Sequence, residues 1–158
     1  MRGSFSEFLN LLELRGASWC NVEFGAAGGF SILQNEEMFF YAALEGPVRI
    51  AGVTGGTILM VPGDIVIILS GEAHAVRNQP GARTDAIEYL SEGYYSDVPA
   101  RFRIGEEERI TSRLLCGRLK VRWPSGLVRK ALPALVTIAA DDAMVSTSVL
   151  ERAARRHC

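Results

Sequence analysis

Only a few residues of this 158-residue chain have a type and spacing that could support chemistry. His74 is the foremost, because an imidazole can hydrogen-bond a ligand, bind a metal ion or satisfy a polar contact in a core. Cys116 shares a predicted strand face with Arg118, Lys120 and Arg122, which leaves open that it faces solvent or a partner. The nearby positive charge would then lower the pKa of its thiol, but we favour the interpretation of Cys116 as a structural or inert thiol. The sequence contains no nucleophile-elbow, phosphate-loop, dinucleotide-binding or HExxH motif, so no catalytic residue is predicted.

The residues around His74 are spaced to turn one strand back onto the next. Gly63 and Asp64 turn the chain into an apolar run, and Gly71 permits a tight turn after that run. His74 then enters the following strand. Three interpretations stay open for its side chain: a residue lining a pocket, a hydrogen-bonded histidine of the core, or a metal ligand.

A second predicted strand carries the other candidate residues. Side chains alternate along a strand, so Phe39, Tyr41 and Glu45 share one face. The two aromatic residues are expected to line a core or a pocket, whereas Glu45 is either a pocket residue or a solvated turn residue. Glu45 and His74 alone are two ligands short of the usual four, and one short of the three protein ligands of catalytic zinc. No metal site is therefore predicted.

The pattern between residues 19 and 122 is that of an all-β domain. Short runs rich in Val, Ile, Phe and Tyr alternate with Gly, Pro, Asn or Asp, which favour turns. Ten short strands without helix-length crossovers indicate a sandwich or barrel rather than a parallel α/β sheet. The predicted strands are 19–24, 29–34, 37–44, 47–51, 56–61, 64–69, 73–77, 85–90, 99–104 and 111–122.

Both ends of the chain show helical patterns. Ser4 and Glu7 have capping-box spacing, the apolar residues up to Leu12 recur at helical intervals, and Gly16 is a suitable helix stop. Toward the other end, 127–132 predicts a helical turn or two, and 134–140 a last strand or extended segment. A final helix would begin at Asp141 or Asp142 and carry arginines near its end, as the helix dipole favours.

Composition and charge exclude several classes of protein. Hydrophobic residues make up 48% of the chain, which is enough for a core, and the length suits one domain. No run approaches the roughly 18–20 apolar residues that cross a bilayer, and acidic residues interrupt the N-terminus where a signal peptide would be apolar. A net charge of −1 without a basic stripe argues against direct nucleic-acid binding. Three scattered cysteines make no disulfide framework, so a cytoplasmic setting is expected.

The stretch from Gly63 to Asn78 resembles the second motif of the cupin family, G-x5-P-x-G-x2-H-x3-N, with Leu69 in the place of the proline. In cupins the histidine of this motif points into the barrel and binds a metal. The resemblance therefore implies an interior position for His74.

The first cupin motif is matched only in part. Glu45 and Gly52 have the family spacing between its glutamate and its glycine. Its two histidines fall at positions that carry Phe39 and Tyr41 here. The resemblance thus implies the cupin fold with its metal site lost.

A further resemblance narrows the family. The segment TSRLLCGR at 111–118, followed by LVRKALP at 127–133, is similar to the tail of the cupin domains at the N-terminus of AraC-type transcription regulators. The resemblance covers about residues 4–140 and depends on the order and spacing of the motifs. It implies an effector-sensing and dimerisation domain that acts on DNA only through a separate helix-turn-helix domain. No such helix pair follows in this sequence, so we interpret the chain as a fragment of a regulator or a stand-alone sensor.

We therefore predict a mainly β fold: a cupin-like antiparallel β-barrel (jelly roll) over 1–140 with a short N-terminal helix, and a truncated C-terminal helix over 141–158. A small-molecule effector is expected in a pocket lined by Phe39, Tyr41, Glu45 and His74, without cofactor or metal, in a homodimer. One alternative is a metal-dependent cupin enzyme such as a dioxygenase or isomerase. Another is a purely structural dimer module with a collapsed barrel and no pocket.

Overall fold

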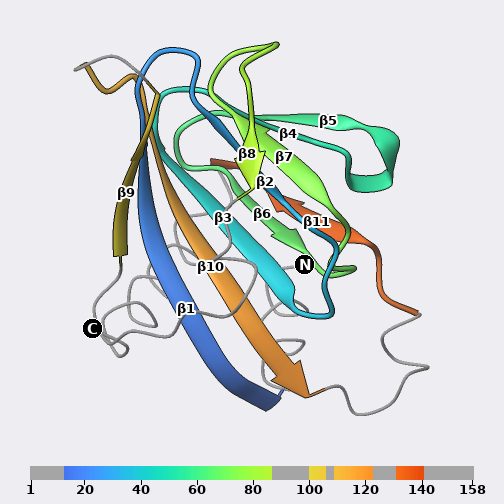
Figure 1. The fold of residues 1–158 in the computed structure, drawn as a ribbon. Coiled ribbons are helices and arrows are strands. Elements are labelled where there is room, and N and C mark those ends of the chain that lie inside the picture. The colour runs from blue at the N-terminus through green and yellow to red at the C-terminus, as the bar shows by residue number, and fades with distance from the viewer. Residues whose placement is uncertain (1–12, 87–99, 106–108, 123–130, 141–158) are drawn as a thin grey trace.

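The computed structural model describes residues 13–86, 100–105, 109–122 and 131–140 (Figure 1). Eleven strands lie within these residues, in two sheets ordered β11-β6-β3-β10-β1-β9 and β5-β4-β7-β2-β8. The elements are β1 (Glu13–Phe24), β2 (Gly29–Ile32), β3 (Met38–Glu45), β4 (Val48–Ala51), the 3-10 turn η1 (Val53–Gly55), β5 (Thr57–Met60), β6 (Ile65–Ile68), β7 (His74–Arg77), β8 (Asp85–Ala86), β9 (Ala100–Ile104), β10 (Ser112–Arg122) and β11 (Leu135–Ile138).

The two sheets face one another across an apolar interior, and most neighbouring strands are antiparallel. The long strands β1 and β10 of the six-stranded sheet are paired with each other and lie side by side in Figure 1. Two pairs, β1 with β9 and β2 with β8, are parallel. The predicted β fold is confirmed in this coarse form. Among the described residues no hydrogen-bonded ladder joins the two sheets, so they form a sandwich rather than the closed antiparallel barrel we expected.

The middle of the six-stranded sheet, at β6 and the first half of β3, is buried on both faces. Phe39 and Tyr41 of β3 pack between the sheets with Phe30 of β2, whereas Met38 and Phe40 belong to a second buried cluster on the opposite face. All four residues of β6 are buried for the same reason. A strand covered on both faces reads as a continuous apolar run instead of an alternating one. This accounts for the runs at 38–41 and 65–68.

Asn78, the last residue of the quoted motif, fastens the loop between β1 and β2. Its buried Oδ1 accepts a hydrogen bond from the backbone N–H of Gly28 at 2.8 Å. Its Nδ2 donates to the carbonyl oxygen of Gly25 at 2.6 Å and to Thr111 Oγ1 at 2.9 Å. A buried amide with both of its ends satisfied in this way joins β7, the β1–β2 loop and the start of β10.

The predicted strands are found close to where the pattern placed them, and the extended segment at 134–140 contains β11. The first strand begins earlier than expected, at Glu13, so a helix ending at Gly16 is wrong. Cross-strand pairing with β10 explains the difference: the register shifts between Leu14 and Gly16, and this bulge lets the chain stay in the sheet.

The predicted helices over residues 4–12, at 127–130 and over 141–158 lie outside the described residues. So does the proposed division of the chain at residue 140. Within the part of the chain that the structure describes, no helix is long and apolar enough to cross a membrane.

Candidate ligand-binding site

Tyr41 and His74 meet in the interior between the two sheets. Tyr41 lies in the middle of β3, and His74 is the first residue of β7 in the opposite sheet. The Tyr41 hydroxyl oxygen is 2.5 Å from His74 Nε2, and the two rings stand nearly perpendicular with centroids 5.5 Å apart. Tyr41 is 0% exposed and His74 is 4% exposed. A side-chain hydrogen bond therefore links the two sheets inside an otherwise apolar core.

The second ring nitrogen of His74 fixes how the protons are arranged. His74 Nδ1 lies 2.8 Å from the carbonyl oxygen of Glu72, and a carbonyl can only accept. Nδ1 therefore carries the proton, Nε2 is the acceptor, and the Tyr41 hydroxyl donates to it. Burial lowers the pKa of His74 and raises that of Tyr41 well above its usual value. Both side chains are consequently held in their neutral forms.

Aromatic rings surround this polar pair. Phe39 meets His74 edge-on, with ring centroids 5.3 Å apart. Phe30, from the opposite sheet, lies 6.4 Å from the Tyr41 ring. The rest of the surroundings is aliphatic and is buried in the same cluster, with contributions from Ile32, Ile50, Ile68 and Val76. Tyr41 and His74 thus form a polar pair with mainly apolar surroundings.

The turn before β7 holds His74 in place. The Glu72 carboxylate accepts hydrogen bonds from the backbone N–H of Thr54 at 3.0 Å and from Ser70 Oγ at 2.9 Å. These bonds, the first above all, lower the pKa of Glu72. Gly71 has φ +73°, and a Cβ there would collide with the carbonyl oxygen of Asn35. The glycine of the quoted motif is therefore required both by the backbone conformation and by close packing.

Glu45 does not join the other predicted site residues. Its side chain is 62% exposed and lies 3.3 Å from Arg113 on the surface. The pairing of β3 with β10 shifts register at Leu44, since Arg113 opposes Glu45 whereas Leu114 opposes Ala43. The extra residue breaks the alternation that would have put Glu45 on the inner face. The expectation of a shared face is wrong, and the solvated alternative is confirmed.

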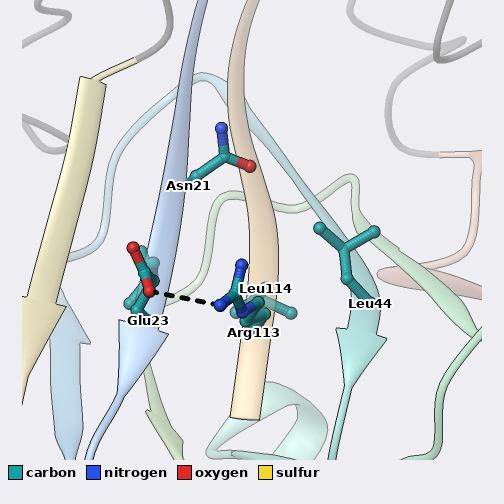
Figure 2. A pocket seen from close by; sticks show the side chains of 6 residues that line it. Asn21, Glu23, Leu44, Arg113 and Leu114 are labelled. Carbon is teal, nitrogen blue, oxygen red and sulfur yellow. Dashed lines mark ion pairs between the residues drawn. The ribbon is translucent and has the colours of Figure 1, made fainter. Parts of the chain in front are cut away.

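The same register shift opens a shallow pocket on the outside of the six-stranded sheet (Figure 2). Its volume is about 160 Å³. Arg113 lies beside it, 3.8 Å from Glu23 and 3.3 Å from Glu45. Because two carboxylates already neutralise this guanidinium, the pocket is poorly suited to an anion. Its lining residues are Asn21, Val22, Glu23, Leu44, Arg113 and Leu114.

Cys116 lies inside the molecule rather than at its surface. It is buried on the inner face, directly opposite Cys20 on β1 and beside Tyr41 on β3. Burial, with the neighbouring Cys20 thiol, raises the pKa of Cys116 well above its usual value, so the thiol is unreactive. The solvent-facing alternative is wrong, because the strand face that carries Cys116 and Arg118 turns inward, and the favoured interpretation of an inert thiol agrees with the structure. On this face of β10 only Lys120 and Arg122, at the far end of the strand, are exposed.

A buried ion pair between Arg118 and Glu37 was missed by the sequence analysis. Arg118 opposes Phe39 across β10 and β3, so the pair lies at the end of the interior that carries this ring. Glu37 alternates with Phe39 and Tyr41 along the chain, and that spacing was the signal that could have revealed it. Two charges so close to the aromatic residues add polar character at one end of the interior.

The residues present do not fit a metal ion. In metal-binding cupins the motif histidine is a metal ligand. Here Nε2 of His74 already accepts a hydrogen bond from the Tyr41 hydroxyl. Phe39 has no ligand atom, and Glu45 lies outside. Among the described residues no group of three or more His, Cys, Asp or Glu side chains could hold a metal. No chemistry through a metal is therefore derived for this site.

The sequence matches a known protein family over nearly its whole length. A cupin family model matches residues 4–156. No curated protein matches the sequence significantly. Among solved structures, the chain is similar to the protein YhaK from Escherichia coli (14% identity, TM-score 0.42) and to unsaturated fatty acid bound ToxT from Vibrio cholerae (6% identity, TM-score 0.47). The alignments cover 80% and 87% of this chain but only 44% of each of those proteins, so the chain spans less than half of their length.

Proposed function

Since this chain belongs to the cupin family, in the group whose members serve as effector-binding domains of AraC-type transcription regulators, we propose that its interior binds a small-molecule effector. The observation that carries the proposal is the Tyr41–His74 hydrogen bond, a neutral polar pair enclosed by Phe39 and other apolar side chains. An effector of mainly apolar character would pack against these side chains and exchange hydrogen bonds with the pair. Glu45 plays no part in the proposed site.

The proposed regulator acts on DNA through a separate domain. The near-neutral charge of the chain supports an indirect role, because direct binding to phosphates depends on clustered basic residues. Effector binding would bias the regulator only if its affinity differs between two states of the protein. The proposal includes a homodimer, which sedimentation equilibrium at micromolar concentration tests. A strictly monomeric chain would remove the dimerisation role and leave effector binding to be judged separately.

The isoleucines offer a direct test of binding between the sheets. Ile32, Ile50 and Ile68 line the interior between the two sheets, whereas Ile65 and Ile67 of β6 lie on the opposite face of the six-stranded sheet. A panel of small apolar alcohols, phenols and carboxylic acids is first screened for compounds that raise the melting temperature. Those compounds are then titrated into protein labelled at the isoleucine methyl groups. We expect methyl shifts at the three interior isoleucines that saturate with compound, and little change at the other two.

Two variants distinguish binding at the Tyr41–His74 pair from binding elsewhere on the protein. Tyr41→Phe should weaken binding of compounds that hydrogen-bond the pair, while Lys120→Gln on the exposed end of β10 should not. Shifts confined to Ile65 and Ile67, or no binding across the panel, would contradict the proposal. The competing metal-enzyme hypothesis has its own readout: a stoichiometric metal in protein purified without chelator, lost in His74→Ala, would establish it instead.

A further inference from the structure

The outer face of the five-stranded sheet carries an uncompensated pair of arginines. Arg49 of β4 and Arg77 of β7 are direct cross-strand partners, and both point away from the interior because Val48, Ile50 and Val76 point into it. Residues paired in this way have neighbouring Cβ atoms, and like charges placed so destabilise a sheet. Among the described residues, no carboxylate forms an ion pair with Arg49 or Arg77.

A second observation points to a missing acceptor. The Nε atom of Arg49 is buried and has no hydrogen-bond partner among the described residues. Arg77 uses its Nε to donate to the carbonyl oxygen of Ala82 at 2.8 Å, which orients the side chain and leaves its terminal nitrogens for other acceptors. A buried donor without a partner costs free energy that an incoming acceptor would recover. The same acceptor would relieve the repulsion between the two guanidinium groups.

The surroundings of the pair suit a protein partner. Leu59 of β5 is the cross-strand partner of Arg49 and is 52% exposed, and Val61, two residues further on, is 47% exposed. β5 is one of the two edge strands of its sheet as the structure describes it. The remaining side chains of this face are small, at Gly29, Ser31, Ala51, Thr57 and Ala75. Arginine is enriched in protein interfaces, and the buried centre of such interfaces is more apolar than the rest of the surface. Two arginines without ion pairs beside exposed aliphatic side chains therefore suit an interface with another protein.

We propose that Arg49 and Arg77 form a docking site for an acidic segment of a partner protein, with a carboxylate between the two guanidinium groups and an apolar side chain against Leu59. Arginine binds carboxylates in a bidentate manner, and charge-assisted bonds of this kind are stronger than neutral ones. Nucleic acid is the less suitable occupant, because the patch has only two such arginines and its flank at β5 is apolar. This site is separate from the interior and does not depend on effector binding there.

Peptide binding tests the proposal on the whole chain. The probes are fluorescein-labelled octapeptides built from Glu, Leu and Ser, each with a counterpart in which Gln replaces Glu. Binding is followed by anisotropy at about 50 mM and about 300 mM NaCl, because screening weakens exposed charge pairs. We expect the Glu peptides to bind at low salt and to weaken at high salt. In Arg49→Gln or Arg77→Gln the affinity should fall about tenfold, the effect of losing one charge-assisted contact.

Lys120→Gln is the matched control, since it removes the same charge from the exposed part of the other sheet. It should change peptide affinity by less than about twofold if the effect is local rather than one of net charge. Arg49→Gln should melt no lower than the unmodified protein at low salt, because it removes a repulsive pair and an unpartnered donor. Equal binding of the Gln peptides, an equal loss in Lys120→Gln, or no peptide binding would overturn the proposal. So would tighter binding of a short DNA duplex that Arg49→Gln abolishes.

Discussion

The Tyr41 hydroxyl donates a 2.5 Å hydrogen bond to His74 Nε2, the ring nitrogen that faces the interior. In the cupin motif that this chain resembles, position 41 holds a histidine and the partner of His74 is a metal. Here the phenol of Tyr41 stands in the place of that histidine and, as the partner of His74, in the place of the metal. The substitution converts a site for a cation into a neutral hydrogen-bonded pair between two sheets, and it makes the stability of the core depend on that bond.

Tyr41→Phe tests this dependence. The variant keeps the ring but leaves Nε2 of His74 buried without a donor, and an unsatisfied buried group costs about 1–3 kcal/mol. We expect a loss of that size in the free energy of unfolding measured with urea. In the double variant Tyr41→Phe with His74→Phe the loss should be smaller than the two single losses added together, because no polar atom is stranded. Additive losses would show that the two side chains do not interact.

The stability of the protein should also depend on pH through His74. Burial lowers its pKa in the folded chain, whereas in the unfolded chain it titrates near about 6.5. Below about pH 6.5 the unfolded chain therefore binds a proton that the folded chain does not, and the free energy of unfolding falls as the pH is lowered toward the folded pKa. Above about pH 6.5 both states are neutral and this contribution is constant.

Urea unfolding of the protein and of His74→Gln at several pH values isolates this contribution. The amide oxygen of glutamine can accept the Tyr41 proton, but the side chain does not titrate. We expect the variant to lose less stability than the parent between about pH 6.5 and pH 5. Parallel curves over this range would mean that His74 has the same pKa in both states.

The strands could be predicted well from the sequence because residues that favour turns lie between the apolar runs. This pattern can be recognised from neighbouring residues alone. The sequence predicted Phe39, Tyr41 and His74 in the interior because strand alternation and motif spacing agree there. It failed at Glu45, since the bulge at Leu44 arises from pairing with β10 and has no local signal. The solvent-facing alternative for Cys116 failed for a related reason. Alternation tells which residues share a face, but only the packing of a second sheet decides which face is buried.

Asn78→Ala should destabilise the end of the sandwich where β1, β7 and β10 meet. The change removes the hydrogen bond that Asn78 accepts and the two that it donates. The N–H of Gly28 and the carbonyl oxygen of Gly25 then lose this partner. Each such group costs about 1–3 kcal/mol when buried. Gln79→Ala is the control, because its side chain is exposed next to the same site. A thermal melt that shows equal midpoints for the two variants would refute the role assigned to Asn78.

Alanine substitutions at Gly71 and Gly81 distinguish the cost of backbone strain from the cost of close packing. Both have positive φ, +73° and +76°, so alanine at either position has a similar conformational cost of about 1–2 kcal/mol. A Cβ at Gly81 meets no atom within 4 Å, whereas one at Gly71 collides with the carbonyl oxygen of Asn35. Gly71→Ala must therefore move the turn that carries His74, and overpacking adds about 1–3 kcal/mol. We expect Gly81→Ala to unfold at a slightly lower urea concentration than the parent and Gly71→Ala at a much lower one. The displaced turn also carries His74, which accepts the hydrogen bond of the Tyr41 hydroxyl. Only Gly71→Ala should therefore alter the near-ultraviolet circular dichroism of the buried aromatic residues. An unchanged spectrum in this variant would show that the contact with Asn35 does not fix the turn.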